Sequence, residues 1–246
     1  MKENLWVTNL QVFLFRLIFK PWVRRSARHI LQGRLLDPAN PERGRWLRSD
    51  INRLLSAIWK RTETLTPSAR LHLIPTLGNR VNVYLAIVTT ASYQMLLEDG
   101  HSKTRSADLT ADVGWKIYER AIGLISLPFR LTSKNPAHRI ERTVRAMLIF
   151  PFSAPGRPGY EVKVRKNNGV LHTDWTWCPP QAFVRTLTEE QGDKGELDAF
   201  YASWCLYDWP GADVMAANGK RDHYARKKTL SRGDKVCDMC WKFNTP

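Results

Sequence analysis

Three short stretches in the last third of the chain organise the rest of the sequence. They read TWCPPQAF at residues 176–183, SWCLYDWP at 203–210 and YARKKTLSRGDKVCDMCWKF at 224–243. All four cysteines lie in these stretches, and each stands within a few residues of a tryptophan and of an aspartate or a proline. Because four thiols scattered at random would rarely gather in this way, these stretches are the first place to look for chemistry.

The spacing of the cysteines limits the chemistry they can support. Cys237 and Cys240 form the one close pair, whereas a structural zinc site usually needs two such pairs. The pair also lies in a strand-like run, where residues three apart point to opposite faces, so Cys240 should face away from Cys237. A metal held by Cys178, Cys205 and Cys237 stays open as an alternative. A second alternative is that the thiols are small buried apolar groups, and a disulfide framework is not expected.

The period of the sequence changes from helical to two after the loop at residues 152–159. Residues 160–165 alternate, Asn167-Asn168-Gly169 is typical of a hairpin turn, and residues 170–177 return as a partner strand. One face of that strand should carry His172, Asp174, Thr176 and Cys178, and the other Leu171, Thr173, Trp175 and Trp177. A second hairpin is predicted from residues 222–230 and 236–243.

The first 150 residues are predicted to be mainly helical. Helices are expected over residues 5–22, from an N-cap at Ser49-Asp50 through Ile58, from after Gly78-Asn79 to Gly100, over 110–127 closed by Pro128, and over 136–150. Later, Pro179-Pro180 should open a helix directly after Cys178, which would favour an acidic thiol. A further helix over 196–207 should carry Cys205, with Asp208 at its end and a loop at 209–219. The predicted class is therefore α+β, a helical N-terminal half followed by an antiparallel sheet of two hairpins with intervening helices.

The last third also resembles a known family. The segments W-C-P at 177–179, W-C-L-Y-D at 204–208 and R-K-K-T-L-S-R-G-D-K-V-C-D at 226–238 are similar to the pattern of the L-2-amino-thiazoline-4-carboxylic acid hydrolases. That resemblance covers about 70 residues closely and the helices from about residue 70 more loosely. It implies a basic helical N-terminal arm at 1–66 added to a family domain at 67–246.

The resemblance implies a hydrolase that opens a C–N or C–S bond in a small cyclic, anionic substrate by cysteine and aspartate chemistry. The candidate catalytic residues are Cys178, Cys205, Asp208 and Cys237, and the candidate substrate-binding residues are Arg226, His223 and Asp238. A cysteine would act as the nucleophile, Asp208 would hold the amidinium, Arg226 a substrate carboxylate, and His223 would move the proton. These groups are expected to converge on one pocket.

Each of these roles has a plainer alternative. Asp208 could cap a turn, Arg226 could pair with Asp238, and His223 could be a surface residue. A different class of function is a non-catalytic or isomerising protein that binds a larger hydrophobic ligand. No glycine-rich nucleotide loop is present, so no organic cofactor is expected.

The chain carries a net charge of +15 over 246 residues. Residues 1–66 hold 13 Lys/Arg against 5 Asp/Glu, a balance of +8, which favours an anionic partner. Residues 5–28 combine an apolar run with arginines and could lie on a membrane surface or be buried against protein. Without a helix-turn-helix, RRM or KH signature, nucleic acid is not the expected partner, whereas a homo-oligomer stays open. The cysteines and the lack of a targeting signal favour a cytoplasmic protein, with membrane association open. Residues 1–35 should be dispensable for chemistry.

Overall fold

The computed structural model describes residues 2–167 and 169–242, with side chains from residue 5 onward. Asn168 of the first predicted turn and Phe243 of the last predicted strand lie outside this range. The chain divides into two compact units, each made of three segments. Unit 1 consists of Met1–His72, Val83–Ile117 and Phe183–Ser203, and unit 2 of Leu73–Asn82, Tyr118–Ala182 and Trp204–Pro246. The division into residues 1–66 and 67–246 stays a prediction.

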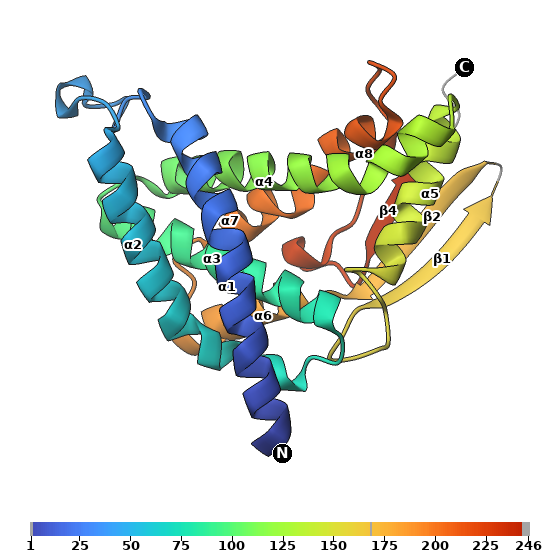
Figure 1. Cartoon of the computed structure of the whole chain (residues 1–246), viewed down its shortest axis with the longest axis horizontal. Helices are drawn as coiled ribbons and strands as arrows, with labels where there is room; N and C mark the ends of the chain where they lie inside the picture. Colours follow the sequence, from blue (N-terminus) through green and yellow to red (C-terminus); the bar gives the residue numbers. More distant parts are fainter. Residues whose placement is uncertain (1, 168, 243–246) are drawn as a thin grey trace. The chain divides into compact units, whose positions relative to one another are not determined.

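Helices form most of the first 150 residues, as predicted (Figure 1). In chain order the α-helices are α1 (Lys2–Leu31), α2 (Arg48–Leu65), α3 (Leu77–Glu98), α4 (Lys103–Thr132), α5 (Pro136–Ile149), α6 (Pro179–Gln191), α7 (Glu196–Ser203) and α8 (Asp208–Ala216). Short 3-10 helices are η1 (Pro41–Arg43), η2 (Thr66–Ala69), η3 (Leu71–Leu73), η4 (Cys205–Tyr207) and η5 (Leu230–Arg232). None of the described helices is both long and apolar enough to cross a bilayer.

The start of α2 corrects the predicted cap. The helix begins at Arg48, with Leu47 in the extended N-cap position, so Ser49 and Asp50 lie inside its first turn. The Asp50 carboxylate accepts a hydrogen bond from the Leu47 N–H at 3.0 Å, which satisfies one of the free donors of the helix start. The acidic residue therefore stabilises the helix from its third position.

Two segments that contain proline are more helical than predicted. Pro128 lies inside α4, which continues to Thr132, because one missing N–H donor weakens a long helix without ending it. Residues 209–216, predicted as a loop, form most of α8, where Pro210 occupies the first turn and needs no donor. That helix ends at Ala217, which adopts a left-handed conformation with φ of 48°.

A four-stranded antiparallel sheet lies in unit 2. It consists of β1 (Glu161–Asn167), β2 (Val170–Trp177), β3 (Tyr224–Ala225) and β4 (Cys237–Trp241), in the order β1-β2-β4-β3. The α+β class and the two antiparallel hairpins are confirmed. The second hairpin is shorter than predicted, because η5 takes up residues 230–232 between its strands.

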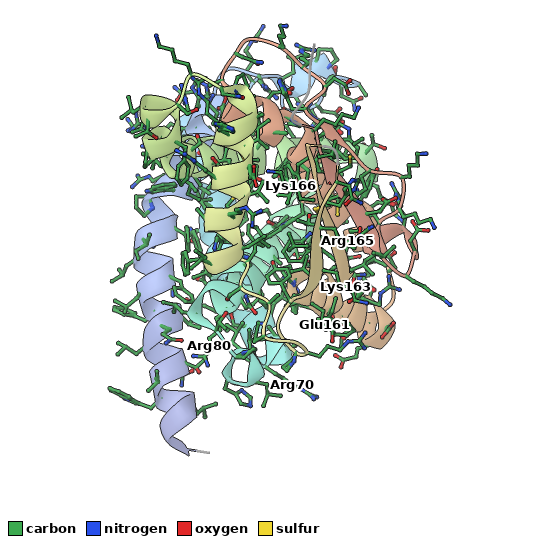
Figure 2. All side chains as sticks on the ribbon, turned by 90° about the vertical axis from the view of Figure 1, so that its right-hand side faces the viewer. Arg70, Arg80, Glu161, Lys163, Arg165 and Lys166 are labelled. Atoms are coloured by element: carbon green, nitrogen blue, oxygen red, sulfur yellow. The ribbon has the colours of Figure 1, made fainter. Side chains whose placement is uncertain are left out.

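The edge strand β1 is strongly charged. Glu161, Lys163, Arg165 and Lys166 come from this strand, and residues 163–167 are exposed (Figure 2). Arg165 donates to Asp174 on β2 at 3.0 Å, across the hairpin. Charged side chains on an edge strand discourage pairing with another chain, so β1 ends the sheet.

The predicted alternation of β2 is confirmed from Leu171 to Thr176, but Cys178, predicted to share the face of Thr176, lies beyond the end of the strand and packs against the buried cluster that contains Trp175. Leu171, Thr173 and Trp175 are buried, while Thr176 on the other face is exposed. The indole N–H groups of Trp175 and Trp241 both donate to the Thr173 hydroxyl, at 3.1 and 3.0 Å. On this face the sheet packs into a core that contains Ile122, Ile140, Val144, Met147, Leu171, Ala212, Met215, Tyr224 and Trp241. This core holds β2, β3 and β4 against α5 and α8. It thereby fixes the ends of these strands and of α8, where the candidate site residues of the three quoted stretches lie.

Candidate active site

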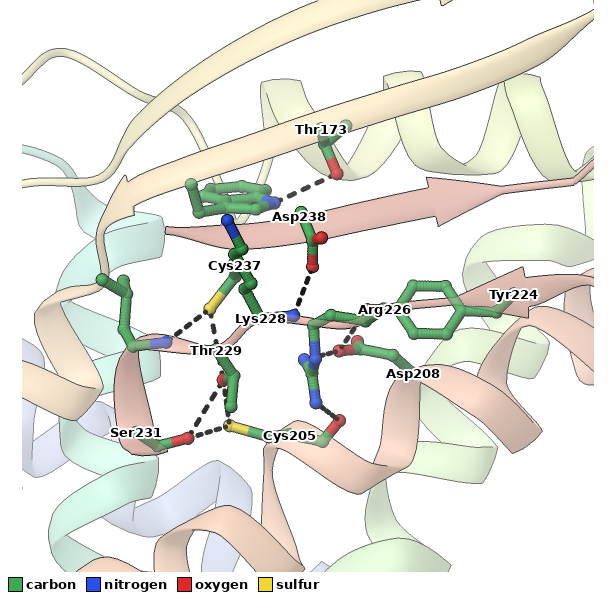
Figure 3. Close-up of polar contacts among 12 residues, drawn as sticks. Thr173, Cys205, Asp208, Tyr224, Arg226, Lys228, Thr229, Ser231, Cys237 and Asp238 are labelled. Carbon is green, nitrogen blue, oxygen red and sulfur yellow. Dashed lines mark hydrogen bonds and ion pairs between the residues drawn. The ribbon is translucent and has the colours of Figure 1, made fainter. Parts of the chain in front are cut away.

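The polar residues of the three quoted stretches gather in unit 2. Cys178 follows β2, Cys205 begins η4, Asp208 begins α8, Arg226 follows β3, and Cys237 begins β4. Figure 3 shows four of these five, all except Cys178, together with the hydroxyls of the loop between β3 and β4. Hydrogen bonds join Cys205, Asp208, Arg226 and Cys237 in one cluster, although their segments are distant in sequence. That these residues line a pocket together with Cys178 stays a prediction.

A buried ion pair forms one half of this cluster. The Arg226 guanidinium donates to Asp208 Oδ2 at 2.9 Å and to the backbone carbonyl of Cys205 at 2.9 Å. The Tyr224 hydroxyl donates to the same Asp208 oxygen at 3.2 Å. The Arg226 side chain is 2% exposed and lies over the ring of Trp209, 4.8 Å from its centroid. A charge so buried requires its partner, and Asp208 supplies it.

Hydroxyl groups link two of the thiols in the other half. The Thr229 hydroxyl lies 3.3 Å from Cys237 Sγ and 3.9 Å from Cys205 Sγ, and Ser231 Oγ lies 3.1 Å from Cys205 Sγ. The backbone N–H of Leu230 donates to Cys237 Sγ at 3.2 Å. Both sulfurs therefore belong to one hydrogen-bonded network (Figure 3).

Cys178 is half-buried at the start of α6, where the backbone N–H of Gln181 donates to its thiol. Burial nevertheless raises the pKa of Cys178 well above its ordinary value, and the charges of Cys237, Cys205 and Asp208 raise it further. The predicted acidic thiol is therefore wrong, because loss of water outweighs the field of the helix start. Cys178 packs against the buried cluster of Tyr160, Trp175 and Cys237, which places it in the same part of unit 2.

The other thiols are also protonated near neutral pH. Burial raises the pKa of Cys205 to about 11, against the opposing effect of its bond to Ser231. Burial raises the pKa of Cys237 as well, although Thr229 and Leu230 stabilise its thiolate. A thiol in this cluster would need a base to remove its proton before it could act as a nucleophile.

Asp208 has the properties of such a base. Burial raises its pKa to about 6, although the charge of Arg226 and the hydrogen bonds from Tyr224 and Arg226 act to lower it. For Arg226, burial acts to lower the pKa, but the negative charges of Asp208, Tyr224, Cys205 and Cys237 together outweigh it and the pKa is raised. A carboxylate that titrates near neutral pH can both accept and return a proton during a reaction.

His223 lies outside this cluster and is not a surface residue. Its side chain is 2% exposed, its Nδ1 lies 2.8 Å from Asp213 Oδ1, and its Nε2 lies 3.2 Å from the Asn218 amide nitrogen. Both ring nitrogens therefore contact polar groups near the end of α8. This arrangement favours a structural role for His223.

The Asp238 carboxylate accepts hydrogen bonds from backbone N–H groups instead of pairing with a side chain such as Arg226. Its Oδ1 accepts from the N–H groups of Lys227 and Lys228, at 2.9 and 2.6 Å. The alternative pairing of Arg226 with Asp238 is therefore not the one observed. Cys240 pairs in register with His172, and Cys237 with Trp175, so the two cysteines lie on opposite faces of β4, as predicted.

The sequence did not predict several residues that lie in or beside the cluster. Thr229 and Ser231 lie within the T-L-S-R-G-D run, but a hydroxyl there has no signal apart from the resemblance itself. Tyr118 on α4 stacks on Tyr207, with ring centroids 5.6 Å apart, and burial raises its pKa, with a further contribution from Asp208. Nothing in a long amphipathic helix marks this tyrosine as a neighbour of Asp208.

The part of the chain that the structure describes contains no group of three His, Cys, Asp or Glu side chains arranged to hold a metal ion. Comparison with protein-family models, with curated proteins and with solved structures finds no match for this chain.

Proposed function

We propose that this chain is a hydrolase of the L-2-amino-thiazoline-4-carboxylic acid hydrolase type, which opens a C–N or C–S bond in a small cyclic, anionic substrate. The observation that carries the proposal is the gathering of Cys205, Cys237 and Asp208 in one network around Arg226. The resemblance of the last third of the sequence to that family supports the same reaction.

Cys205 is the proposed nucleophile. Cys205 is half-buried as a residue, whereas Cys237 is only 6% exposed, which favours Cys205 as the cysteine that meets a substrate. Its carbonyl is held by Arg226, which orients the residue. The Ser231 hydroxyl, 3.1 Å from the Cys205 sulfur, can hold the S–H bond in one direction.

In the proposed reaction, Cys205 Sγ adds to the carbon between the ring heteroatoms while its proton passes to the Asp208 carboxylate. The ring C–N or C–S bond then breaks, and Asp208 returns the proton to the departing nitrogen or sulfur. Water attacks the sulfur-bound carbon and releases Cys205 with its proton restored. The net change is the addition of one water molecule.

The role of Arg226 in this proposal follows from its contacts. Its guanidinium already binds Asp208 and the Cys205 carbonyl and is almost fully buried, so we assign it a positioning role instead of contact with a substrate carboxylate. Attraction of an anionic substrate falls to exposed cations on the same loop, Lys227, Lys228 and Arg232.

Turnover of the thiazoline carboxylate and of bulkier heterocycles tests the proposal. Cys205→Ser and Asp208→Asn should each lower kcat by about 100-fold or more, as loss of a nucleophile or an acid-base group does. Cys240→Ser, which changes a thiol on the other face of β4, and Asp222→Asn, which changes a 75% exposed carboxylate, should leave kcat unchanged.

The alternative is a protein that binds a larger hydrophobic ligand. Unit 1 contains an apolar cavity of about 50 Å³ between residues such as Val23, Leu55 and Val88. Ligand sites are usually about 300–1,000 Å³, so this cavity as it stands is too small for such a ligand. Tight binding of a hydrophobic ligand with no heterocycle opened by the wild type would nevertheless reject the hydrolase proposal.

A further inference from the structure

Helix α1 has two opposite faces that carry apolar side chains. One face packs within unit 1, where Phe15, Val23 and Ala27 are buried and the Phe15 ring lies 5.8 Å from that of Tyr84. The other face leaves large apolar side chains in contact with solvent, each 44–69% exposed: Trp6, Leu10, Phe13, Leu14, Leu17 and Ile18. Helices of stable proteins rarely expose so many large apolar residues together.

The exposed face has a second part that is basic. Trp6, Leu10, Phe13 and Leu17 follow one another at intervals of three or four residues, and Lys20 and Arg24 continue the same line. Lys20, Arg24 and the adjacent Arg25 are all exposed. We name this line from Trp6 to Arg24, with Arg25, the α1 stripe. It is apolar for its first three turns and cationic after them.

The charges around the α1 stripe narrow the choice of partner. Residues 4–36 contain no Asp or Glu, whereas they contain six Lys or Arg residues. The ion pair of Arg16 with Glu63 of α2 engages one of these cations within unit 1. A second copy docked through the same stripe would offer apolar side chains but no carboxylate to Lys20 and Arg24.

We infer that the α1 stripe binds the surface of an anionic phospholipid bilayer. The hydrocarbon boundary would take up the apolar residues, and the lipid phosphates and carboxylates would neutralise the cations that follow. Trp6 at the far end suits the headgroup region, where tryptophan is enriched. At about 1.5 Å per residue, residues 6–18 would lie along about 18 Å of the interface. This inference does not depend on the proposed reaction.

Sedimentation of the full chain with vesicles tests the inference. The wild type should bind vesicles made of equal parts of phosphatidylcholine and phosphatidylserine, bind vesicles of phosphatidylcholine alone weakly, and lose binding as salt rises. Arg24→Gln combined with Arg25→Gln should weaken binding by about 25-fold, about fivefold for each charge. Leu17→Gln should weaken it by about tenfold or more.

Two control variants make the same kinds of substitution, with the same loss of charge, at exposed positions outside the α1 stripe. Arg53→Gln combined with Lys60→Gln removes two exposed cations from α2, and Leu47→Gln changes a leucine that is 63% exposed, against 55% for Leu17. Both controls should bind vesicles as the wild type does. Because all these positions are exposed, the free energy of unfolding should change little in each variant.

Three results would overturn the inference. The first is no binding of the wild type to either vesicle, and the second is equal binding by Leu17→Gln and the wild type. The third is a dimer in solution that Leu17→Gln separates into monomers without any vesicle binding, which would assign the stripe to a second copy. Turnover by Leu17→Gln in the absence of vesicles reports separately on the hydrolase proposal.

Discussion

Replacement of Asp208 by asparagine should change how the free energy of unfolding depends on pH. Asparagine keeps the size of the side chain and an oxygen that can accept from Arg226 and Tyr224, but it cannot titrate. Burial raises the pKa of Asp208 from its ordinary value of 3.8 to about 6, with Arg226 and Tyr224 opposing the shift. The folded protein therefore binds this proton more tightly than the unfolded chain does.

The sign of the effect follows from that difference. The contribution of protonated Asp208 to stability is fully present below pH 3.8 and is lost as the pH rises through 6. A difference of about two pKa units corresponds to about 3 kcal/mol, since each unit is worth about 1.4 kcal/mol. Relative to Asp208→Asn, the wild type should therefore lose about 3 kcal/mol between about pH 3 and pH 7, of which about 2 kcal/mol is lost between pH 4 and pH 6.

Urea unfolding followed by tryptophan fluorescence at a series of pH values measures the difference. Asp222→Asn, at an exposed position, controls for the general effect of one lost carboxylate. The reasoning is refuted if the wild type gains stability over Asp208→Asn as the pH rises from 4 to 6. That result would mean that the Arg226 charge outweighs burial and that Asp208 is not a base poised near neutral pH.

Two further predictions concern packing and the thiol network. Gly78→Ala should destabilise the protein by about 1–3 kcal/mol, because the new Cβ would lie 2.6 Å from the Pro151 carbonyl oxygen. Gly123→Ala, which has open space around it, should be neutral or stabilise the protein by up to about 1 kcal/mol. Thermal unfolding of the two variants compares these effects. Thr229→Val should lower the free energy of unfolding by about 1 kcal/mol and slow the alkylation of Cys237, because the Cys237 thiolate loses a hydrogen-bond donor. An unchanged alkylation rate at fixed pH would contradict this contact.

Local patterns were sufficient to predict much of the fold. The buried positions Ile51, Leu54, Leu55 and Ile58 of α2 repeat at helical spacing, and α5 begins at Pro136, where the sequence predicts its first turn. The alternation along β2 likewise follows from side chains that point to opposite faces. These features depend on residues within one or two turns of each other.

Features set by distant contacts could not be predicted in the same way. The pairing of β2 with β4 joins Thr173 to Met239, and no local pattern selects that partner. Cys178 packs against a buried cluster of Tyr160, Trp175 and Cys237, so its helix-start position alone indicated the wrong direction of its pKa shift. The convergence of the cysteines was predicted only because the resemblance placed their segments together in order.

Arg226 contacts both ends of one short turn, since its guanidinium binds the carbonyl of Cys205 and the carboxylate of Asp208. Insertion or deletion of a single residue between these two positions would rotate the carboxylate by about 100° around the helix axis, away from the guanidinium. Binding of both groups by one arginine therefore requires a fixed number of residues between Cys205 and Asp208. In related sequences, insertions and deletions should be absent from residues 205–208. They should occur instead in turns whose two ends are not bound by one buried charge, such as residues 37–44.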